Sequence, residues 1–190
     1  MVIGQMAKVK EILEPYMDVI IFMVTLLVVN YAWKYTVIGD EHGDEVTWFG
    51  LDITAPFEFM SCHVASVVYW IVSLFRDTAH MVGEHTIRFD SGSATTIIWG
   101  CSGFKQMFIW MCLMLTVRGN RTTWLHKLWY IPLGWICCHA FNILRIALIA
   151  LAIEHHPTWF YMLHDYIFKY MFYAMLFGLW VIFVEKIRIQ

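Results

Sequence analysis

The sequence predicts an all-α integral membrane helical bundle with about four transmembrane helices, an interfacial helix at the outer face and a short β-hairpin. Of the 190 residues, 60% are hydrophobic and 17% aromatic, whereas only 15% are charged. A soluble domain is nearer half apolar and a quarter charged. Four apolar segments are also long enough to cross about 30 Å of hydrocarbon, which takes about 20 residues of helix. We therefore expect one membrane domain over residues 1–190.

The four predicted spans cover residues 16–38, 95–117, 128–153 and 159–184. Lysine and arginine in short loops stay on the cytoplasmic side, so their positions predict the orientation. Such residues precede the first span, separate the second from the third and follow the last: Lys8, Lys10, Arg118, Arg121, Lys127, Lys186 and Arg188. If all three places are cytoplasmic, an even number of crossings precedes Arg118.

A fifth apolar segment, residues 57–75, would make that number odd if it crossed. It is short, begins directly after Pro56 with Glu58 near its start, and carries His63 among several small residues. We therefore interpret it as a half-buried helix at the outer face. The alternative is a full fifth span with the N-terminus outside.

The outer region then covers residues 40–93, which are rich in acidic side chains. Near its end, HTIRF and ATTIIW flank the turn sequence DSGS. Two β-rich runs around a Gly-Ser turn predict a short hairpin. This hairpin would lead directly into the span that carries Cys101.

Three polar residues converge in the outer part of the predicted bundle. Cys101 falls in the first turns of the second span and His164 in the first turns of the last. Arg145 comes about eight residues before the outer end of the third span, or roughly 12 Å at 1.5 Å per residue. A charge at the centre of a membrane helix costs about 2.5–3.5 kcal/mol on insertion scales, and such residues are usually functional.

The three residue types suit catalysis by a thiol. A cysteine attacks as the thiolate, which a nearby cation favours. An imidazole can take the thiol proton and later give it to a leaving amine. A guanidinium stays charged and can stabilise an oxyanion.

Two small residues and a lysine follow Cys101 in the sequence CSGFKQ. We expect Ser102 and Gly103 to leave room for a substrate backbone. Lys105 lies four residues after Cys101, so in a helix both would face the same way. It would hold substrate, help to set the thiolate pKa, or extend its amine toward the interface.

Supporting residues are also predicted beside the other two. Asn142 lies one turn before Arg145 and is expected to orient it by a hydrogen bond. Asp165 is a candidate partner for His164, and Lys169, at i+4, is its alternative partner. His139 lies one turn deeper than Asn142 and is expected to make a hydrogen bond between helices.

The chain resembles the exosortase/archaeosortase family of membrane-embedded cysteine transpeptidases, and it resembles the compact members most. The resemblance rests on GCSG at 100–103, HAFNILRIALIAL at 139–151, LHDYIF at 163–168 and the following apolar helix, which ends in GLWVIFVEK. It covers the chain from about Val82 to the end. Before Val82 the match is only one of general character, so the resemblance says little about how a substrate is recognised.

The resemblance implies that Cys101, Arg145 and His164 are the catalytic residues. The family acts on exported proteins that end in a short motif, an apolar helix and a basic tail, and it passes the cleaved product to another acceptor. It also implies a multi-pass protein of the plasma (inner) membrane with its active site toward the outer face. Membrane lipids and an unidentified acceptor would be further partners, and no cofactor is needed.

Other functions predict other features. A haem-binding bundle could use His139 and His164 as axial ligands, and a non-enzymatic assembly protein would need no reactive cysteine. The chain has no basic tract or glycine-rich phosphate loop, so nucleic acid is not an expected partner. No two of the five cysteines are spaced as CxxC, so we expect neither a disulfide scaffold nor a zinc ribbon.

Overall fold

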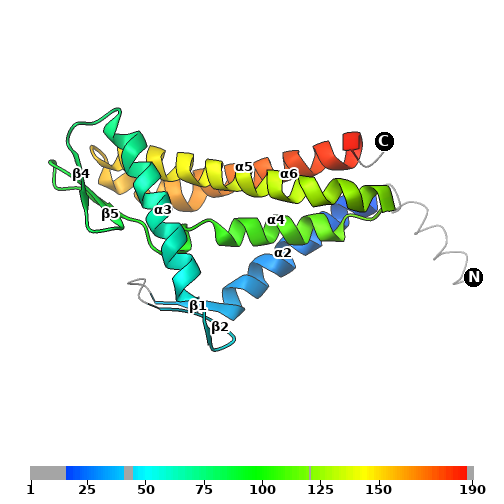
Figure 1. Ribbon diagram of the computed structural model, residues 1–190. Helices are drawn as coiled ribbons and strands as arrows, with labels where there is room; N and C mark the ends of the chain where they lie inside the picture. Colours follow the sequence, from blue (N-terminus) through cyan, green and yellow to red (C-terminus); the bar gives the residue numbers. More distant parts are fainter. Residues whose placement is uncertain (1–15, 41–44, 120, 188–190) are drawn as a thin grey trace, which may run out of the picture.

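Helices make up most of the residues that the computed structural model describes, which are 16–40, 45–119 and 121–187. The α-helices are α2 (Met17–Thr36), α3 (Thr54–Ser73), α4 (Phe104–Thr116), α5 (Arg121–Ile153) and α6 (Phe168–Ile182). A π-helical turn over Met162–Ile167 precedes α6, and another over Phe183–Ile187 follows it. Helices α4, α5 and α6 run along a common axis, and α2 packs against α4 at an angle (Figure 1).

The β-structure is richer than the single predicted hairpin. Two antiparallel three-stranded sheets form, in the orders β1-β2-β3 and β4-β5-β6. Their strands are β1 (Val37–Gly39), β2 (Val46–Trp48), β3 (Leu51–Asp52), β4 (Ala79–Val82), β5 (Thr86–Phe89) and β6 (Ala94–Thr96). The predicted hairpin is confirmed as β5 and β6, in which Ile87 lies opposite Thr95. The sheet β1–β3 and the strand β4 were not predicted.

Four helical segments are long and apolar enough to cross a membrane, but they are not the predicted four. They are α2, α3, α5 and the segment Pro157–Ile187. The prediction of one helix over 95–117 is wrong, because a strand and a turn come first. The helix that remains, α4, has 13 residues, about 20 Å at 1.5 Å per residue, which is less than the thickness of the hydrocarbon core.

Helix α3 contains most of the segment 57–75. By its length and composition, it is one of the four helical segments that could cross a membrane. Figure 1 shows it running steeply across the axis of α4, α5 and α6 rather than along it. The interpretation of this segment as an outer-face helix that does not cross stays a prediction.

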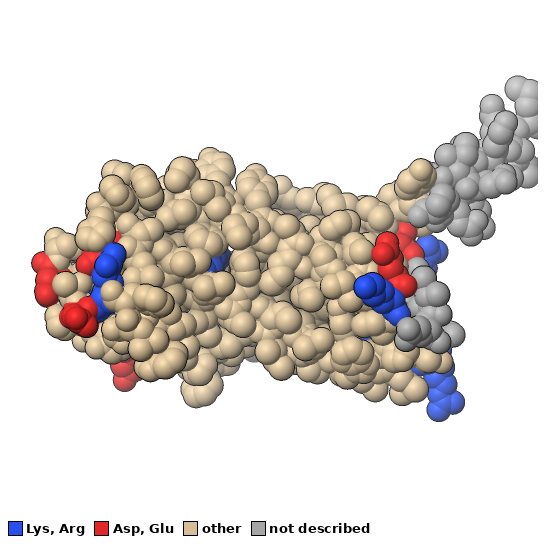
Figure 2. All heavy atoms as spheres, turned by 90° about the horizontal axis from the view of Figure 1, so that it is seen from above, with Lys and Arg blue, Asp and Glu red and all other residues tan. Residues whose placement is uncertain are grey.

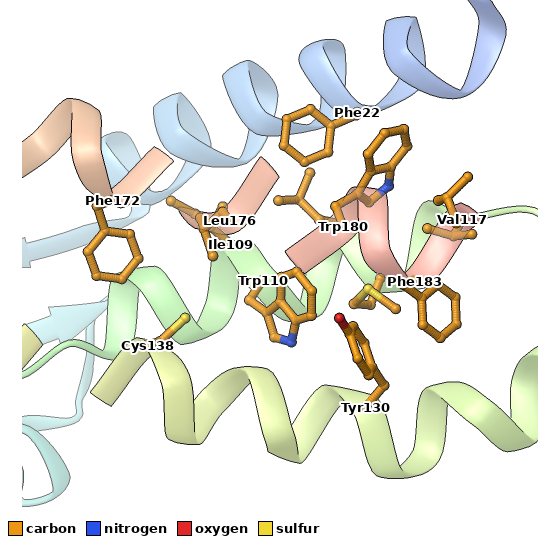
Figure 3. Close-up of a cluster of buried hydrophobic side chains, with 13 residues drawn as sticks. Phe22, Ile109, Trp110, Val117, Tyr130, Cys138, Phe172, Leu176, Trp180 and Phe183 are labelled. Carbon is orange, nitrogen blue, oxygen red and sulfur yellow. The ribbon is translucent and has the colours of Figure 1, made fainter. Parts of the chain in front are cut away.

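The main core lies where α4, α5, α6 and α2 meet, and Figure 3 shows its large aromatic side chains. Trp110 of α4 lies directly against Gly134 of α5, where a Cβ would clash with the indole nitrogen. That nitrogen donates a hydrogen bond to the Ile131 carbonyl at 3.2 Å. Tyr130 likewise donates to the Leu179 carbonyl at 2.8 Å. The polar ends of these buried rings are thus satisfied.

The surface has the charge pattern of a membrane protein. On the face shown in Figure 2, charged side chains gather at the two ends of the molecule, and the surface between them is almost entirely uncharged. Phe22 is the buried residue of α2, whose other large apolar side chains are exposed or half-buried. Lipid tails would cover these side chains in a bilayer. Of the cations that predict the orientation, Lys8, Lys10 and Arg188 lie outside the described residues.

Lys127 differs from its predicted place in a cytoplasmic loop. It lies in the first turns of α5 and is only 1% exposed. Its amine donates to the Val117 carbonyl at 2.6 Å and to the Leu115 carbonyl at 3.4 Å, and it lies 4.0 Å from the centre of a Trp124 ring. Lys127 therefore closes the C-terminal end of α4.

Candidate functional site

Cys101 lies in a tight turn ahead of α4, not in the first turns of a helix as expected. After β6 the chain makes a 3-10 turn over Trp99–Cys101. The Cys101 amide donates to the Ile98 carbonyl at 2.8 Å, and the Ser102 amide donates to the Trp99 carbonyl at 3.1 Å. The strand pairing of β6 thus fixes where the thiol lies.

Gly103 packs closely against Asn142, whereas Ser102 lines a cavity of about 280 Å³. The expected room for a substrate backbone stays a prediction. Gly103 has a φ of +88°, a left-handed conformation that glycine adopts without strain. A Cβ on Gly103 would lie 3.3 Å from the side-chain nitrogen of Asn142. Ser102 is 1% exposed, and its hydroxyl accepts a hydrogen bond from the Phe104 amide at 3.4 Å.

The side chain of Asn142 makes its hydrogen bond to Cys101 and not to Arg145. The residue is fully buried, and its side-chain amide donates to the backbone carbonyl of Cys101 at 2.7 Å. The prediction that Asn142 orients Arg145 by a hydrogen bond is therefore wrong. Its side-chain oxygen has no hydrogen-bond partner among the described residues.

Arg145 lies one turn after Asn142 on α5 and is only 6% exposed. Burial raises the pKa of the Cys101 thiol, and the positive charge of Arg145 opposes that shift. The carboxylate of Asp165 also attracts the guanidinium. Within the described part of the chain, the Nε atom of Arg145 has no hydrogen-bond partner. A buried cation therefore lies within electrostatic range of the thiol and keeps a donor unused.

His164 and Asp165 lie in the π-helical turn before α6, a type of turn that is frequent at functional sites. Nδ1 of His164 lies 3.0 Å from a carboxylate oxygen of Asp165. The imidazole also stacks on Phe160, with ring centres 5.2 Å apart. Across residues 16–40, 45–119 and 121–187, no ion pair joins Asp165 to Lys169 and no hydrogen bond joins His164 to Cys101. With Nδ1 paired to a carboxylate, Nε2 is the nitrogen left for proton transfer.

Lys105 does not share a helix face with Cys101, because Cys101 precedes the helix. It lines a cavity of about 280 Å³ together with Gly100 and Ser102. Lys34, at the end of α2, lines the same cavity and repels Lys105 electrostatically, as Lys169 does. The sequence analysis did not predict Lys34 as a residue of this site. Its position near the end of an apolar helix was the one signal that could have indicated it.

An apolar groove of about 770 Å³ lies beside this cavity. It is lined by side chains from α2, β1, β2, α3, α4 and α5, among them Met60, Phe104, Met107 and Met111. Trp33, Val37 and Phe57 line both the groove and the cavity. An apolar ligand in the groove would therefore lie next to the cavity that Gly100 and Ser102 line.

The two histidines proposed as haem ligands have separate neighbours. His139 stacks on His63 of α3, with ring centres 5.3 Å apart, whereas His164 stacks on Phe160. The hydrogen bond expected for His139 is also missing at Nδ1, which has no partner among the described residues. This arrangement lends no support to a shared haem.

Comparison with models of known protein families, with curated proteins and with solved structures found no match.

Proposed function

We propose that the chain is a membrane cysteine peptidase or transpeptidase that cleaves the C-terminal sorting signals of exported proteins at the outer face of the membrane. The observation that carries the proposal is that the half-buried Cys101 thiol lies within electrostatic range of the buried Arg145, together with the Asn142 hydrogen bond that ties Cys101 to the same helix. An isolated charge inside a membrane bundle is costly, so a function accounts for it better than packing does.

The reaction begins when the thiolate of Cys101 attacks the scissile carbonyl and a C–S bond forms. Arg145 stabilises the oxyanion on the carbonyl oxygen, because its planar guanidinium keeps its charge in an apolar site. His164, which has taken the thiol proton, gives it to the leaving amine as the C–N bond breaks. A thioester on Cys101 remains.

The second half of the reaction regenerates the enzyme. Water or an acceptor amine attacks the thioester carbonyl and loses a proton to His164. Arg145 again stabilises the oxyanion, and the C–S bond breaks to release Cys101. Asp165 holds the imidazole through Nδ1 during both halves. The acceptor decides between hydrolysis and transfer.

The apolar groove supports a substrate that presents a helix. An exported protein with a C-terminal apolar helix could place this helix against α2 and α4, where the groove is lined by methionine and aromatic side chains. The peptide next to the helix would then reach the cavity beside residues 100–102, which Lys34 and Lys105 line.

Co-expression with a candidate substrate tests the proposal. The substrate is an exported protein, encoded beside this one, that ends in a short motif, an apolar helix and a basic tail. We expect the wild type and the control Cys112→Ser to process it and Cys101→Ser to leave it intact. Hydroxylamine should release a substrate fragment from Cys101 in the wild type. Processing that survives Cys101→Ser in a membrane-inserted protein would refute the proposal.

A further inference from the structure

Three metal-ligating side chains that have no role in the proposed reaction come together in the structure. Cys62 lies in the middle of α3, and Glu84 and His85 lie in the turn between β4 and β5. The Cys62 sulfur is 3.5 Å from a carboxylate oxygen of Glu84 and 3.6 Å from Nε2 of His85. One ligand atom of each residue lies within 4.8 Å of the others.

The two distances from the Cys62 sulfur match those between ligand atoms of a tetrahedral zinc site. A sulfur at 2.3 Å and a nitrogen or oxygen at about 2.0–2.1 Å from one tetrahedral ion lie about 3.5 Å apart. Thiolate, imidazole and carboxylate are also the ligands that zinc takes in proteins. The three side chains therefore lie where a small displacement of each would surround one ion.

The charge around Cys62 favours a cation. Both Glu84 and Glu58 act on the thiol as negative charges. Glu58 precedes Cys62 by four residues on α3, so the two share a helix face. Glu58 and His85 also line one cavity of about 250 Å³. A divalent ion would neutralise a thiolate and two carboxylates that otherwise repel one another.

The ligands are held by two ordered elements. Cys62 is carried by α3, whose neighbouring residues Ser61 and Val64 are buried. The backbone carbonyl of His85 accepts a hydrogen bond from the Ile97 amide at 2.9 Å, which ties the turn to the strand that leads to Cys101. Sites built on such supported elements lose little entropy when the ion binds.

We infer that Cys62, Glu84 and His85 bind a zinc ion. The ion joins α3 to the sheet β4-β5-β6, beside which α3 lies in Figure 1. Three protein ligands leave the fourth position of a tetrahedral ion to water. The cysteine spacing predicts no such site, since ligands from separate elements leave no CxxC motif.

Metal binding to the purified full-length chain in detergent tests this inference with Zn²⁺ alone. We expect about one Zn²⁺ per chain for the wild type, measured by elemental analysis after dialysis against a competing chelator. Cys62→Ser and His85→Gln should bind Zn²⁺ at least tenfold more weakly. The matched controls Cys112→Ser and His155→Gln should bind as the wild type does. Equal binding by Cys62→Ser and Cys112→Ser would refute the site.

Cobalt substitution gives a second readout that does not depend on activity. A thiolate bound to Co²⁺ gives a near-ultraviolet charge-transfer band, which we expect in the wild type and in Cys112→Ser but not in Cys62→Ser. If Cys62→Ser does not fold, Glu84→Gln, which changes an exposed side chain, takes its place and should weaken Co²⁺ binding at least tenfold. Absence of the band in the wild type would overturn the inference and leave the proposed peptidase activity untouched.

Discussion

The side-chain amide of Asn142 donates a 2.7 Å hydrogen bond to the backbone carbonyl of Cys101, and so joins the middle of α5 to the turn before α4. Arg145 follows Asn142 by one turn on the same helix. The position of the thiol relative to the guanidinium therefore depends on a helix rather than on the flexibility of a loop.

Alkylation of Cys101 should depend on pH and on Arg145. Burial raises the pKa of the Cys101 thiol, and Arg145 opposes the shift by stabilising the thiolate. Because the thiolate is the reactive form, labelling of the unliganded protein should increase as pH rises through the alkaline range. Arg145→Gln should move the profile to higher pH, and Arg118→Gln should not. Mass spectrometry of the peptide labelled by iodoacetamide measures this, and an unchanged Arg145→Gln profile would contradict the pairing.

Arg145→Lys should impair substrate processing severely. Lysine keeps a positive charge but lacks the planar fork and can lose its proton when desolvated. Loss of one oxyanion donor costs about 2.7–4 kcal/mol, or at least about a hundredfold in rate. Processing in cells, normalised to the amount of enzyme, measures the effect beside the control Arg118→Lys. Near-normal processing would leave Arg145 with a structural or docking role.

Gly103→Ala should destabilise the protein. Its φ of +88° costs an alanine about 1–2 kcal/mol, and the new Cβ would press on Asn142. Gly178→Ala, in α6, is the matched control, because no described atom lies within 4 Å of a Cβ there. It should be neutral or stabilising by up to about 1 kcal/mol. Thermal unfolding in detergent compares the two, and equal melting temperatures would rule out the strain.

Lys127→Met should destabilise the hairpin of α4 and α5. The substitution keeps the apolar part of the side chain but removes the donor to the Val117 and Leu115 carbonyls. Leaving a buried carbonyl unpaired costs about 1–3 kcal/mol. Arg121→Met, at an exposed position, should change the free energy of unfolding by less than about 0.5 kcal/mol. A comparably small effect of Lys127→Met would show that water replaces the amine.

Cysteine labelling in intact cells tests the orientation. If α3 does not cross the membrane, Glu45→Cys before it and Ser91→Cys after it should both react with a membrane-impermeant maleimide added from outside. Arg121→Cys should react only after the cells are opened. These probes belong in a chain with the other accessible cysteines replaced. Labelling of only one of Glu45→Cys and Ser91→Cys would show that α3 crosses.

The sequence was informative where a pattern is local. Hydrophobic length predicted α2, α5 and the last helix, and β-rich runs around DSGS predicted the pairing of β5 with β6. The run from Thr95 to Val117 misled, because a continuous apolar run does not distinguish helix from strand. Thr95 pairs with β5, and Gly103 begins α4 in a left-handed conformation. Gly100 and Gly103 were the residues that could have indicated a break between the strand and the helix within this run.

Side-chain partners were harder to predict than elements. The sequence places Asn142 and Arg145 on one face of a helix. From the sequence alone, the only hydrogen-bond partners that can be considered for Asn142 are residues of the same helix. The true partner, the carbonyl of Cys101, is 41 residues away in the chain. The cluster of Cys62 with Glu84 and His85 likewise depends on how α3 packs against a sheet. Long-range contacts of this kind leave no spacing in one sequence.

The π-helical turn over Met162–Ile167 sets the rotation of His164 and Asp165 relative to the buried residues of α6 that follow it. A π-turn holds one residue more than an α-turn, and one residue corresponds to about 100° of helical rotation. Phe168, Phe172, Leu176 and Trp180 repeat every four residues and fix α6 in the core. Loss of Ile167 would therefore preserve this packed seam and rotate His164 and Asp165 away from Arg145. A single-codon deletion would thus leave the buried face of α6 in place and turn the His164–Asp165 pair toward another side of the bundle.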